Sequence, residues 1–316
     1  MTNPLISILI PLCNAEHFLK ETVLSALNQT WKNIEIIIVD DGSTDTSYAI
    51  AKGFESEKVK VYQQTNKGAC AARNLAFKKS TGDYIQYLDA DDLLAPDKIK
   101  QQMKLFEKYG NNIICSGQWG RFYQTINDVK WEEQAINKDY PSPINWLIDC
   151  WNGRGMAQTS VWLTPRHLID LAEPWNESLS INQDGEYFSR VLMQASEIKY
   201  CDEAKIYYRS GNVNSISQRK KSDKKVESLL YSYELYQQNC STYINDINVK
   251  KALGNNYLNF IYQHHLEFPQ LAKKAESLFF QLDIGKMWPV GGHRFKKLAS
   301  IIGFKNAIRI NSLINV

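Results

Sequence analysis

Short runs rich in Ile and Val alternate with longer amphipathic stretches in the first third of the chain. Such runs are typical of buried strands, and they cover Ile6–Pro11, Ile34–Asp40, Val59–Gln63 and Tyr84–Leu88. The stretches between them are long enough for about two to four helical turns, and they cover Ala15–Asn28, Thr44–Phe54 and Gly68–Lys79. This alternation predicts an α/β fold with a Rossmann-like, mostly parallel sheet flanked by helices.

The rest of the chain is helical or irregular. Pro96–Tyr109 is expected to form a helix and Ile113–Gly117 a strand, whereas residues 118–175 are rich in tryptophan and have no clean period. A charged run at 218–225 precedes helical sequence over Val226–Gln238 and Val249–Leu266. We therefore predict two domains, residues 1–225 with the sheet and residues 226–316 as a helical C-terminal extension.

The residues that follow the predicted strands carry the candidate chemistry, because open α/β sheets bind ligands at the carboxyl ends of their strands. Three of the four strands end in polar or acidic groups: Pro11-Leu12-Cys13-Asn14, Asp40-Asp41-Gly42-Ser43 and Asp89-Ala90-Asp91-Asp92. Asp89 and Asp91 have the spacing to share one hard divalent cation with substrate phosphate oxygens. The alternative is a plain turn or helix N-cap, the role we predict for Asp92.

The other loops offer groups for a nucleotide. Asp40 can accept hydrogen bonds from a base or a ribose, while Ser43 or Thr44 would cap the next helix. Gly68 lets the backbone approach a ligand, and Arg73 follows one turn later, where it can meet a phosphate or a base carbonyl. An exposed arginine without a ligand is the alternative for Arg73.

Combined in this order, these segments resemble the signatures of family 2 glycosyltransferases of the GT-A fold. The matching segments are Ser7–Glu16, Ser25–Thr30, Ile38–Asp45, Gly68–Asn74 and Tyr87–Asp92. The resemblance implies a nucleotide-diphosphate-sugar donor, a Mg²⁺ or Mn²⁺ ion and inversion at the anomeric carbon. It also implies a nucleotide site made of Pro11, Leu12, Asn14, Glu16, Asp40, Gly68, Arg73, Asp89, Ala90 and Asp91, with Asp91 and Asp89 as metal ligands.

The catalytic base of the family lies in an acidic pair before a helix that ends in Arg. Gln183–Arg190 is similar to that segment, so Asp184 is the predicted base and Glu186 the second choice. The plain alternative for both is a solvated helix N-terminus, where acidic residues are favourable. We expect the donor pocket to include the loop 152–160, with Met156 and Gln158.

The match weakens after Tyr207-Tyr208-Arg209, where many members of the family carry a histidine that is absent here. Arg209 is expected to contact the diphosphate. The Gln-x-x-Arg-Trp motif of processive members is also absent, which favours addition of a single sugar. The predicted function is transfer from a UDP-sugar to a sugar, lipid-linked or peptide acceptor, in synthesis of a cell-surface polysaccharide or glycolipid.

Three other readings compete with this one. A nucleotidyltransferase needs a glycine-rich loop after the first strand, and a dinucleotide-dependent dehydrogenase needs GxGxxG there; neither is present. A silent nucleotide- or carbohydrate-binding module on the same fold stays open, although Asp89, Asp91 and Asp184 argue against it.

Charge adds a statement about partners. The chain has 37 Lys and Arg against 34 Asp and Glu, and a net charge of +3 does not suggest nucleic acid. However, six of the basic and none of the acidic residues follow Asp283. Residues 284–316 therefore predict a basic amphipathic tail that contacts an anionic membrane peripherally, or one packed on the protein with its basic face in water. Without a signal peptide or spanning segment, we expect a cytoplasmic protein, at most peripheral at the inner face of the membrane.

Overall fold

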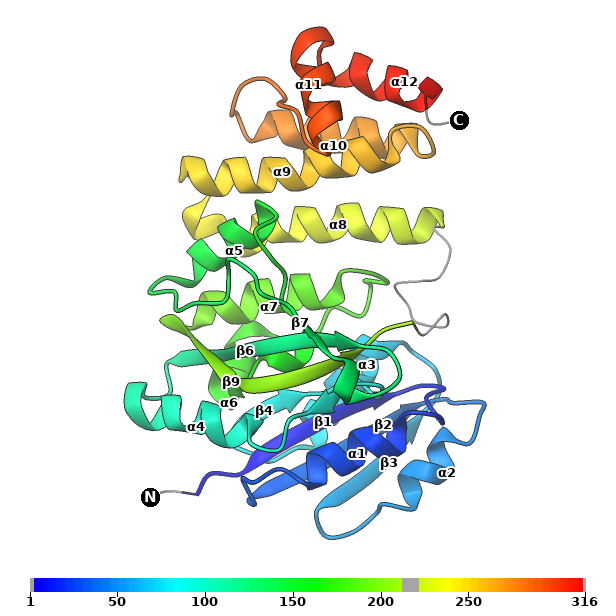
Figure 1. The fold of residues 1–316 in the computed structure, drawn as a ribbon, viewed down its shortest axis with the longest axis vertical. Helices are drawn as coiled ribbons and strands as arrows, with labels where there is room; N and C mark the ends of the chain where they lie inside the picture. The colour runs from blue at the N-terminus through cyan, green and yellow to red at the C-terminus, as the bar shows by residue number, and fades with distance from the viewer. Residues whose placement is uncertain (1–2, 212–221, 315–316) are drawn as a thin grey trace. The chain divides into compact units, whose positions relative to one another are not determined.

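The four apolar runs predicted as strands form most of a five-stranded sheet in the computed structural model, which describes residues 3–211 and 222–314 (Figure 1). β1 (Ile6–Leu12) lies between β2 (Ile34–Asp41) and β4 (Tyr84–Tyr87), and β3 (Val59–Gln64) borders β2. These pairings are parallel, and only the short β8 (Thr164–Pro165) runs antiparallel, beside β4. The predicted mostly parallel α/β sheet is confirmed.

A second sheet was not predicted from the sequence. Its strand order is β5 (Leu93–Leu94), β9 (Glu197–Arg209), β6 (Ile113–Phe122) and β7 (Lys130–Trp131). β6 and β9 pair in parallel, with a bulge between Gly117 and Gln118. A Cβ at Gly117 would lie 2.2 Å from the carbonyl oxygen of Ala204, so only glycine fits at this bulge.

Contacts divide the chain into two compact units. Unit 1 contains both sheets and comprises Met1–Trp146, Gly155–Ser178 and Arg190–Arg219. Unit 2 is helical and comprises Leu147–Arg154, Leu179–Ser189 and Lys220–Val316. Two helices, α5 (Pro143–Trp151) and α7 (Gln183–Gln194), contribute residues to both units. Residues 218–221 of the charged run at 218–225 lie outside the described residues.

The helices of unit 1 pack on the sheets through apolar side chains or through small ones such as alanine. They are α1 (Leu19–Leu27), α2 (Ser47–Lys52), α3 (Ala69–Lys79), α4 (Lys98–Tyr109) and α6 (Arg166–Ala172). In α3 the buried positions are mostly alanine, which lets the helix backbone come near the strands. In α4 the buried Ile99, Met103 and Phe106 recur at helical spacing.

Unit 2 contains the predicted helical C-terminal region. Its helices are α8 (Asp223–Asn239), α9 (Ile247–His264), α10 (Pro269–Gln281), α11 (His293–Ile302) and α12 (Phe304–Ile314). Side chains cap the first two of these: the Ser222 hydroxyl accepts the N–H of Lys225, and Asp246 accepts the N–H of Asn248.

The basic tail packs within unit 2 through its apolar side chains. Phe295 of α11 lies 4.6 Å from Tyr262 of α9 between ring centroids, and Phe304 lies 6.0 Å from Phe295. Arg294, Lys296 and Lys297 are exposed. The structure therefore has the second of the two arrangements considered for this tail, a packed helix with its basic face in water.

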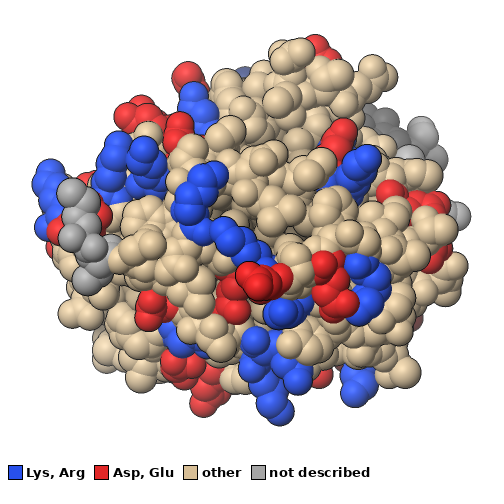
Figure 2. Space-filling model, turned by 90° about the horizontal axis from the view of Figure 1, so that it is seen from below, with Lys and Arg blue, Asp and Glu red and all other residues tan. Residues whose placement is uncertain are grey.

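Two further observations concern partners. No helix within residues 3–211 and 222–314 combines the length and the apolar character needed to cross a bilayer. Figure 2 shows acidic and basic side chains interspersed over a largely uncharged face.

A lysine lies in the core of unit 1. Lys98, the first residue of α4, is fully buried, and its amine donates to Oε1 of Gln86 on β4. Gln86 in turn donates to the carbonyl oxygen of Ser160 at 2.8 Å. Burial lowers the pKa of Lys98 well below its ordinary value, because the charged form loses its water.

Lys98→Met should change how stability depends on pH. Between the lowered folded pKa and the ordinary value of about 10.4, the unfolded wild type binds more protons than the folded protein. Its free energy of unfolding must therefore rise with pH across that window, by at most about 1.4 kcal/mol per pH unit. The variant should lack this increment in urea titrations followed by circular dichroism, whereas Lys100→Met, at an exposed position of α4, should keep it. Equal slopes in Lys98→Met and wild type would contradict the assignment.

Candidate functional site

The strand register brings three loops to one edge of the parallel sheet in unit 1. Leu12, the last residue of β1, pairs with Asp40 of β2, and Leu9 pairs with Tyr87, the last residue of β4. The chain therefore leaves all three strands at the same edge. The predicted nucleotide and metal residues are found in these loops, in the ends of these strands, or at the start of α3, where Gly68 is the N-cap.

The loop after β1 is bonded to the loop after β2. Asn14 has a positive φ of 50°, its Oδ1 accepts the N–H of Thr44 at 2.8 Å, and its own N–H donates to Ser43 Oγ at 3.0 Å. Glu16 accepts the hydroxyl of Thr46 at 2.6 Å, a bond that lowers the pKa of Glu16. Asn14 and Glu16 therefore join two loops, and each has part of its surface exposed at the edge.

Pro11 and Leu12 end β1 beside these loops. The side chain of Leu12 is buried, and Pro11 is half-buried. Leu12 would consequently contact a nucleotide through its backbone atoms.

Asp40 presents a buried carboxylate with one unused oxygen. Its Oδ2 accepts the N–H of Ser43 at 3.2 Å and the amide of Gln63 at 3.1 Å. Its Oδ1 is buried and has no hydrogen-bond partner within the described part of the chain. A buried acceptor without a donor is costly, which makes this oxygen a candidate acceptor for an N–H of a ligand.

Asp41 was not predicted as a site residue, yet it shapes the site. Its Oδ1 accepts the amide of Gln64 and the N–H of Lys67, and its Oδ2 accepts the N–H of Gly68, each at 2.8 Å. Gly68 has φ of 95°, and a Cβ placed there would have no atom within 4 Å. The backbone at Gly68 is therefore fixed by Asp41 and open to a ligand.

Arg73 of α3 pairs with Asp89. Its guanidinium donates to Asp89 Oδ1 at 2.7 Å and lies 4.5 Å from the ring centroid of Trp175. The amide of Asn74 fixes Trp175 by accepting its backbone N–H and donating to its carbonyl oxygen. Arg73 is buried, so the alternative considered for it, an exposed arginine without a ligand, does not hold.

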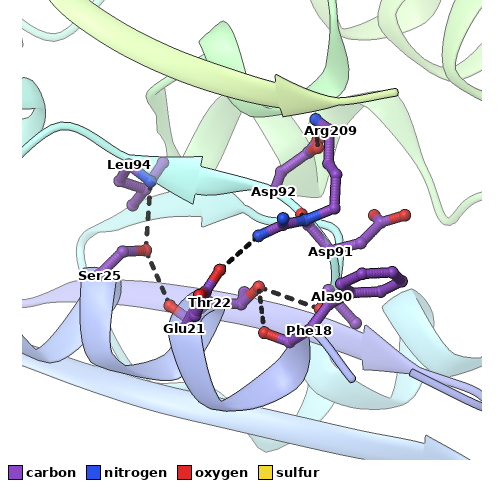
Figure 3. Close-up of polar contacts among 9 residues, drawn as sticks. All are labelled: Phe18, Glu21, Thr22, Ser25, Ala90, Asp91, Asp92, Leu94 and Arg209. Atoms are coloured by element: carbon purple, nitrogen blue, oxygen red, sulfur yellow. Dashed lines mark hydrogen bonds and ion pairs between the residues drawn. The ribbon is translucent and has the colours of Figure 1, made fainter. Parts of the chain in front are cut away.

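The aspartate turn, residues 89–92, is bonded to its surroundings through its backbone (Figure 3). The N–H of Asp92 donates to the carbonyl oxygen of Asp89 at 3.1 Å. The hydroxyl of Thr22 donates to the carbonyl oxygen of Ala90, and Nε of Arg209 donates to that of Asp91. The side chain of Ala90 is buried, while Asp89 and Asp91 are partly exposed.

Of the two roles predicted for Asp92, a turn or a helix cap, the helix cap is wrong. α4 begins at Lys98, with Asp97 at its cap position. Asp92 is fully buried, where its carboxylate accepts the amide of Gln158 at 2.6 Å and the N–H of Arg209 at 2.9 Å. Burial, followed by the charges of Asp91 and Asp89, raises the pKa of Asp92 well above its usual range.

The carboxylate oxygens at this edge suit a hard cation that also binds water or phosphate oxygens. Within residues 3–211 and 222–314 no three His, Cys, Asp or Glu side chains are grouped to bind a metal. Asp89 and Asp91 offer carboxylate oxygens, and one oxygen of Asp89 is paired with Arg73. Two carboxylates fit Mg²⁺ or Mn²⁺ if water and phosphate oxygens complete the coordination.

The remaining predicted residues come from later segments of the chain. Gln158 is buried against Asp92, whereas Met156 is exposed. Asp184 and Glu186 belong to unit 2, in the first turn of α7. Glu186 is buried and accepts the amide of Asn239 of α8 at 3.2 Å, which indicates a structural role. Asp184 is partly exposed and stays the predicted base.

The comparisons with known proteins agree with this geometry. The family model described as Glycosyl transferase family 2 matches residues 7–164, a range that includes all three loops of the sheet edge. The chain belongs to glycosyl transferase family 2. An uncharacterized glycosyltransferase of Haemophilus influenzae is 32% identical over 240 residues, which cover 75% of this chain and 89% of that protein. The uncharacterized glycosyltransferase RC0461 of Rickettsia conorii is 45% identical over 199 residues, 60% of this chain but 32% of that protein.

A solved protein structure is also similar in fold to this glycosyltransferase. Residues 1–349 of S. aureus TarS, crystallised in complex with UDP-GlcNAc, give a TM-score of 0.71 at 18% identity, covering 88% of this chain and 81% of that chain. At that identity the likeness concerns the fold. The predicted family and its GT-A fold are thus confirmed.

Proposed function

We propose that this family 2 glycosyltransferase transfers a single sugar from a UDP-sugar to an acceptor hydroxyl, with inversion and with the help of Mg²⁺ or Mn²⁺. The observation that carries the proposal is the unused Oδ1 of Asp40 at the same sheet edge as Arg73, Asp89 and Asp91. One loop system thus offers groups for a base, a diphosphate and a cation.

The single unused oxygen of Asp40 favours uracil as the base. Uracil has one N–H between two carbonyl groups, whereas guanine presents two neighbouring donors to a carboxylate. Oδ2 of Asp40 already accepts hydrogen bonds from Ser43 and Gln63. Only Oδ1 is left for a base, which matches the single N–H of uracil better than the two donors of guanine. The UDP-GlcNAc in the TarS structure supports the same choice of nucleotide.

The neighbouring groups suit the diphosphate. The open backbone at Gly68 begins α3, and helix N-termini favour anions. Arg73 neutralises Asp89 and adds positive charge to this edge. Asp91 and Asp89 would hold the divalent cation, which, when bound, supplies charge stabilisation to the departing diphosphate.

Asp184 is the proposed general base. The acceptor oxygen forms a bond to C1 of the sugar while Asp184 takes its proton, and the bond between C1 and the diphosphate oxygen breaks. The electron pair of that bond leaves with UDP, and attack from the opposite side inverts the anomeric centre. Glu186 is less suited to this role because it is buried against Asn239.

We propose that the acceptor is a hydroxyl group of a sugar, a lipid-linked molecule or a peptide. The reaction would then contribute to the synthesis of a cell-surface polysaccharide or glycolipid. The second candidate is a silent nucleotide- or carbohydrate-binding module. The partly exposed Asp184 and the two partly exposed aspartates of the turn favour the enzyme.

Asp91→Ala should abolish the gain in UDP affinity that Mn²⁺ provides, because a carboxylate ligand to the cation is lost. We expect the metal-dependent gain, measured by calorimetry, to fall below about a tenth of the wild-type value. UDP binding without metal should be no weaker than in wild type, because the variant loses a negative charge near the diphosphate. Glu57→Ala removes an exposed carboxylate elsewhere in unit 1 and serves as the control. An undiminished gain in Asp91→Ala would sink the metal assignment.

Asp184→Asn should lower turnover and leave UDP affinity intact, because the amide cannot take a proton. Release of UDP from UDP-sugars in the presence of Mn²⁺, alone and with candidate acceptors, should fall about 10²- to 10⁴-fold. Glu186→Gln tests the second choice in parallel. If wild type binds UDP but releases none from any donor, and Asp184→Asn behaves identically, the binding module is the better description.

We also propose that the exposed basic side chains of the tail contact an anionic membrane surface, at the inner face of the membrane in a cytoplasmic protein. Because Phe295 of α11 and Phe304 of α12 are packed inside unit 2, this contact would be mainly electrostatic. Ile301, which is 76% exposed, is the apolar side chain of α11 best placed to join it.

Reversing three charges on α11 tests this contact. Arg294→Glu, Lys296→Glu and Lys297→Glu together should weaken binding to phosphatidylserine vesicles by about a hundredfold or more, at about 1 kcal/mol per basic residue. Reversal of the exposed Lys100, Lys104 and Lys108 on α4 is the matched control. Equal co-sedimentation of both triple variants and wild type would rule the contact out.

A further inference from the structure

The pairing of β5 with β9 places Arg209 beside the aspartate turn. Leu94 pairs with Ile206 and Leu93 with Tyr207 in this antiparallel pair. Continuing the register by two residues puts Arg209 opposite Asp91. Because residue 209 ends β9, the second sheet, absent from our sequence prediction, determines what lies next to the predicted metal ligand.

The guanidinium of Arg209 is held in one orientation. Its Nε donates to the backbone carbonyl of Asp91 at 2.9 Å, and its Nη2 pairs with Glu21 Oε2 at 2.6 Å. It packs between two aromatic rings, with the centroids of Phe18 and Phe122 at 4.8 Å and 4.5 Å. Arg209 was expected to contact the diphosphate, but its side chain, 7% exposed, is occupied by the protein.

Helix α1 supports the same turn from its other side, as Figure 3 shows. The hydroxyl of Thr22 donates to the carbonyl oxygen of Ala90 at 3.0 Å, and Ser25 Oγ accepts the N–H of Leu94 at 3.2 Å. Glu21 belongs to the same helix and reaches Arg209 across the turn. The backbone on which Asp89 and Asp91 are mounted is thus fixed by α1 and β9 together.

We propose that Glu21 and Arg209 are a positioning pair that sets the backbone of Asp91 for metal and diphosphate binding. The inference rests on the proposed function. Glu21 is 63% exposed, so its pairing contributes little to folding, yet it fixes the direction of the guanidinium. Outer partners that orient a metal ligand commonly change metal affinity by about 10- to 100-fold when they are removed.

Glu21→Gln distinguishes positioning from charge by the sign of its effect. If Glu21 acted only through its charge, or if it restrained an Arg209 that binds the diphosphate, its neutralisation would tighten UDP binding. As part of a positioning pair, it should instead reduce the Mn²⁺-dependent gain in UDP affinity by roughly three- to tenfold. UDP affinity without metal and the melting temperature should both match wild type. Tighter UDP binding, or an unchanged gain, would overturn the proposal.

Arg209→Lys gives a second measurement on the other partner. Lysine keeps the charge but lacks the planar fork that reaches Glu21 and the carbonyl of Asp91 together. The metal-dependent gain should drop by roughly tenfold or more, with KM for the donor rising more than kcat falls. Glu107→Gln, an exposed site on α4, is the charge-matched control for Glu21→Gln.

The wild type separates this proposal from the function on which it rests. A wild-type protein without any Mn²⁺-dependent gain refutes the metal site and, with it, the positioning pair. A wild-type gain that survives in both Glu21→Gln and Arg209→Lys refutes the positioning pair alone.

Discussion

Buried carboxylates need hydrogen-bond donors, and in unit 1 this need organises the loops at the edge of the sheet. Asp41 takes its donors from the segment that leads into α3, and Asp92 takes its donors from Gln158 and Arg209. Asp41 ends β2 and Asp92 follows β4, so the sheet fixes the carboxylate end of each bond. The donors come from segments far away in the sequence, which the carboxylates thereby bring to the edge.

Two arginines balance the acidity that results. Arg73 neutralises Asp89 from α3, and Arg209 reaches the turn from β9. Both are buried on aromatic rings, Trp175 in one case and Phe18 with Phe122 in the other. The planar guanidinium groups pack on these rings, which restricts their orientation while their charge acts on the turn. Each arginine therefore brings a fixed positive charge to the aspartate turn.

The sequence predicted the parts of the site that depend on local order. Parallel strands with polar exits placed Asp40, Gly68, Arg73, Asp89 and Asp91 at one edge, because the period of a strand and the direction of a βαβ unit are local properties. It did not predict β9, whose sequence EIKYCDEAKIYYR lacks regular alternation. Without β9, there was no reason to place Arg209 beside the aspartate turn or to select Glu21 as its partner.

The bonds between loops have a consequence for engineering. Asn14 with Thr44, Glu16 with Thr46, and Asp41 with Lys67 and Gly68 tie the segments after β1, β2 and β3 to one another. A designer who transplants one of these segments from a relative would leave unmatched donors and acceptors in the other two. The three segments would therefore have to be replaced together, although almost a fifth of the chain separates the first from the last.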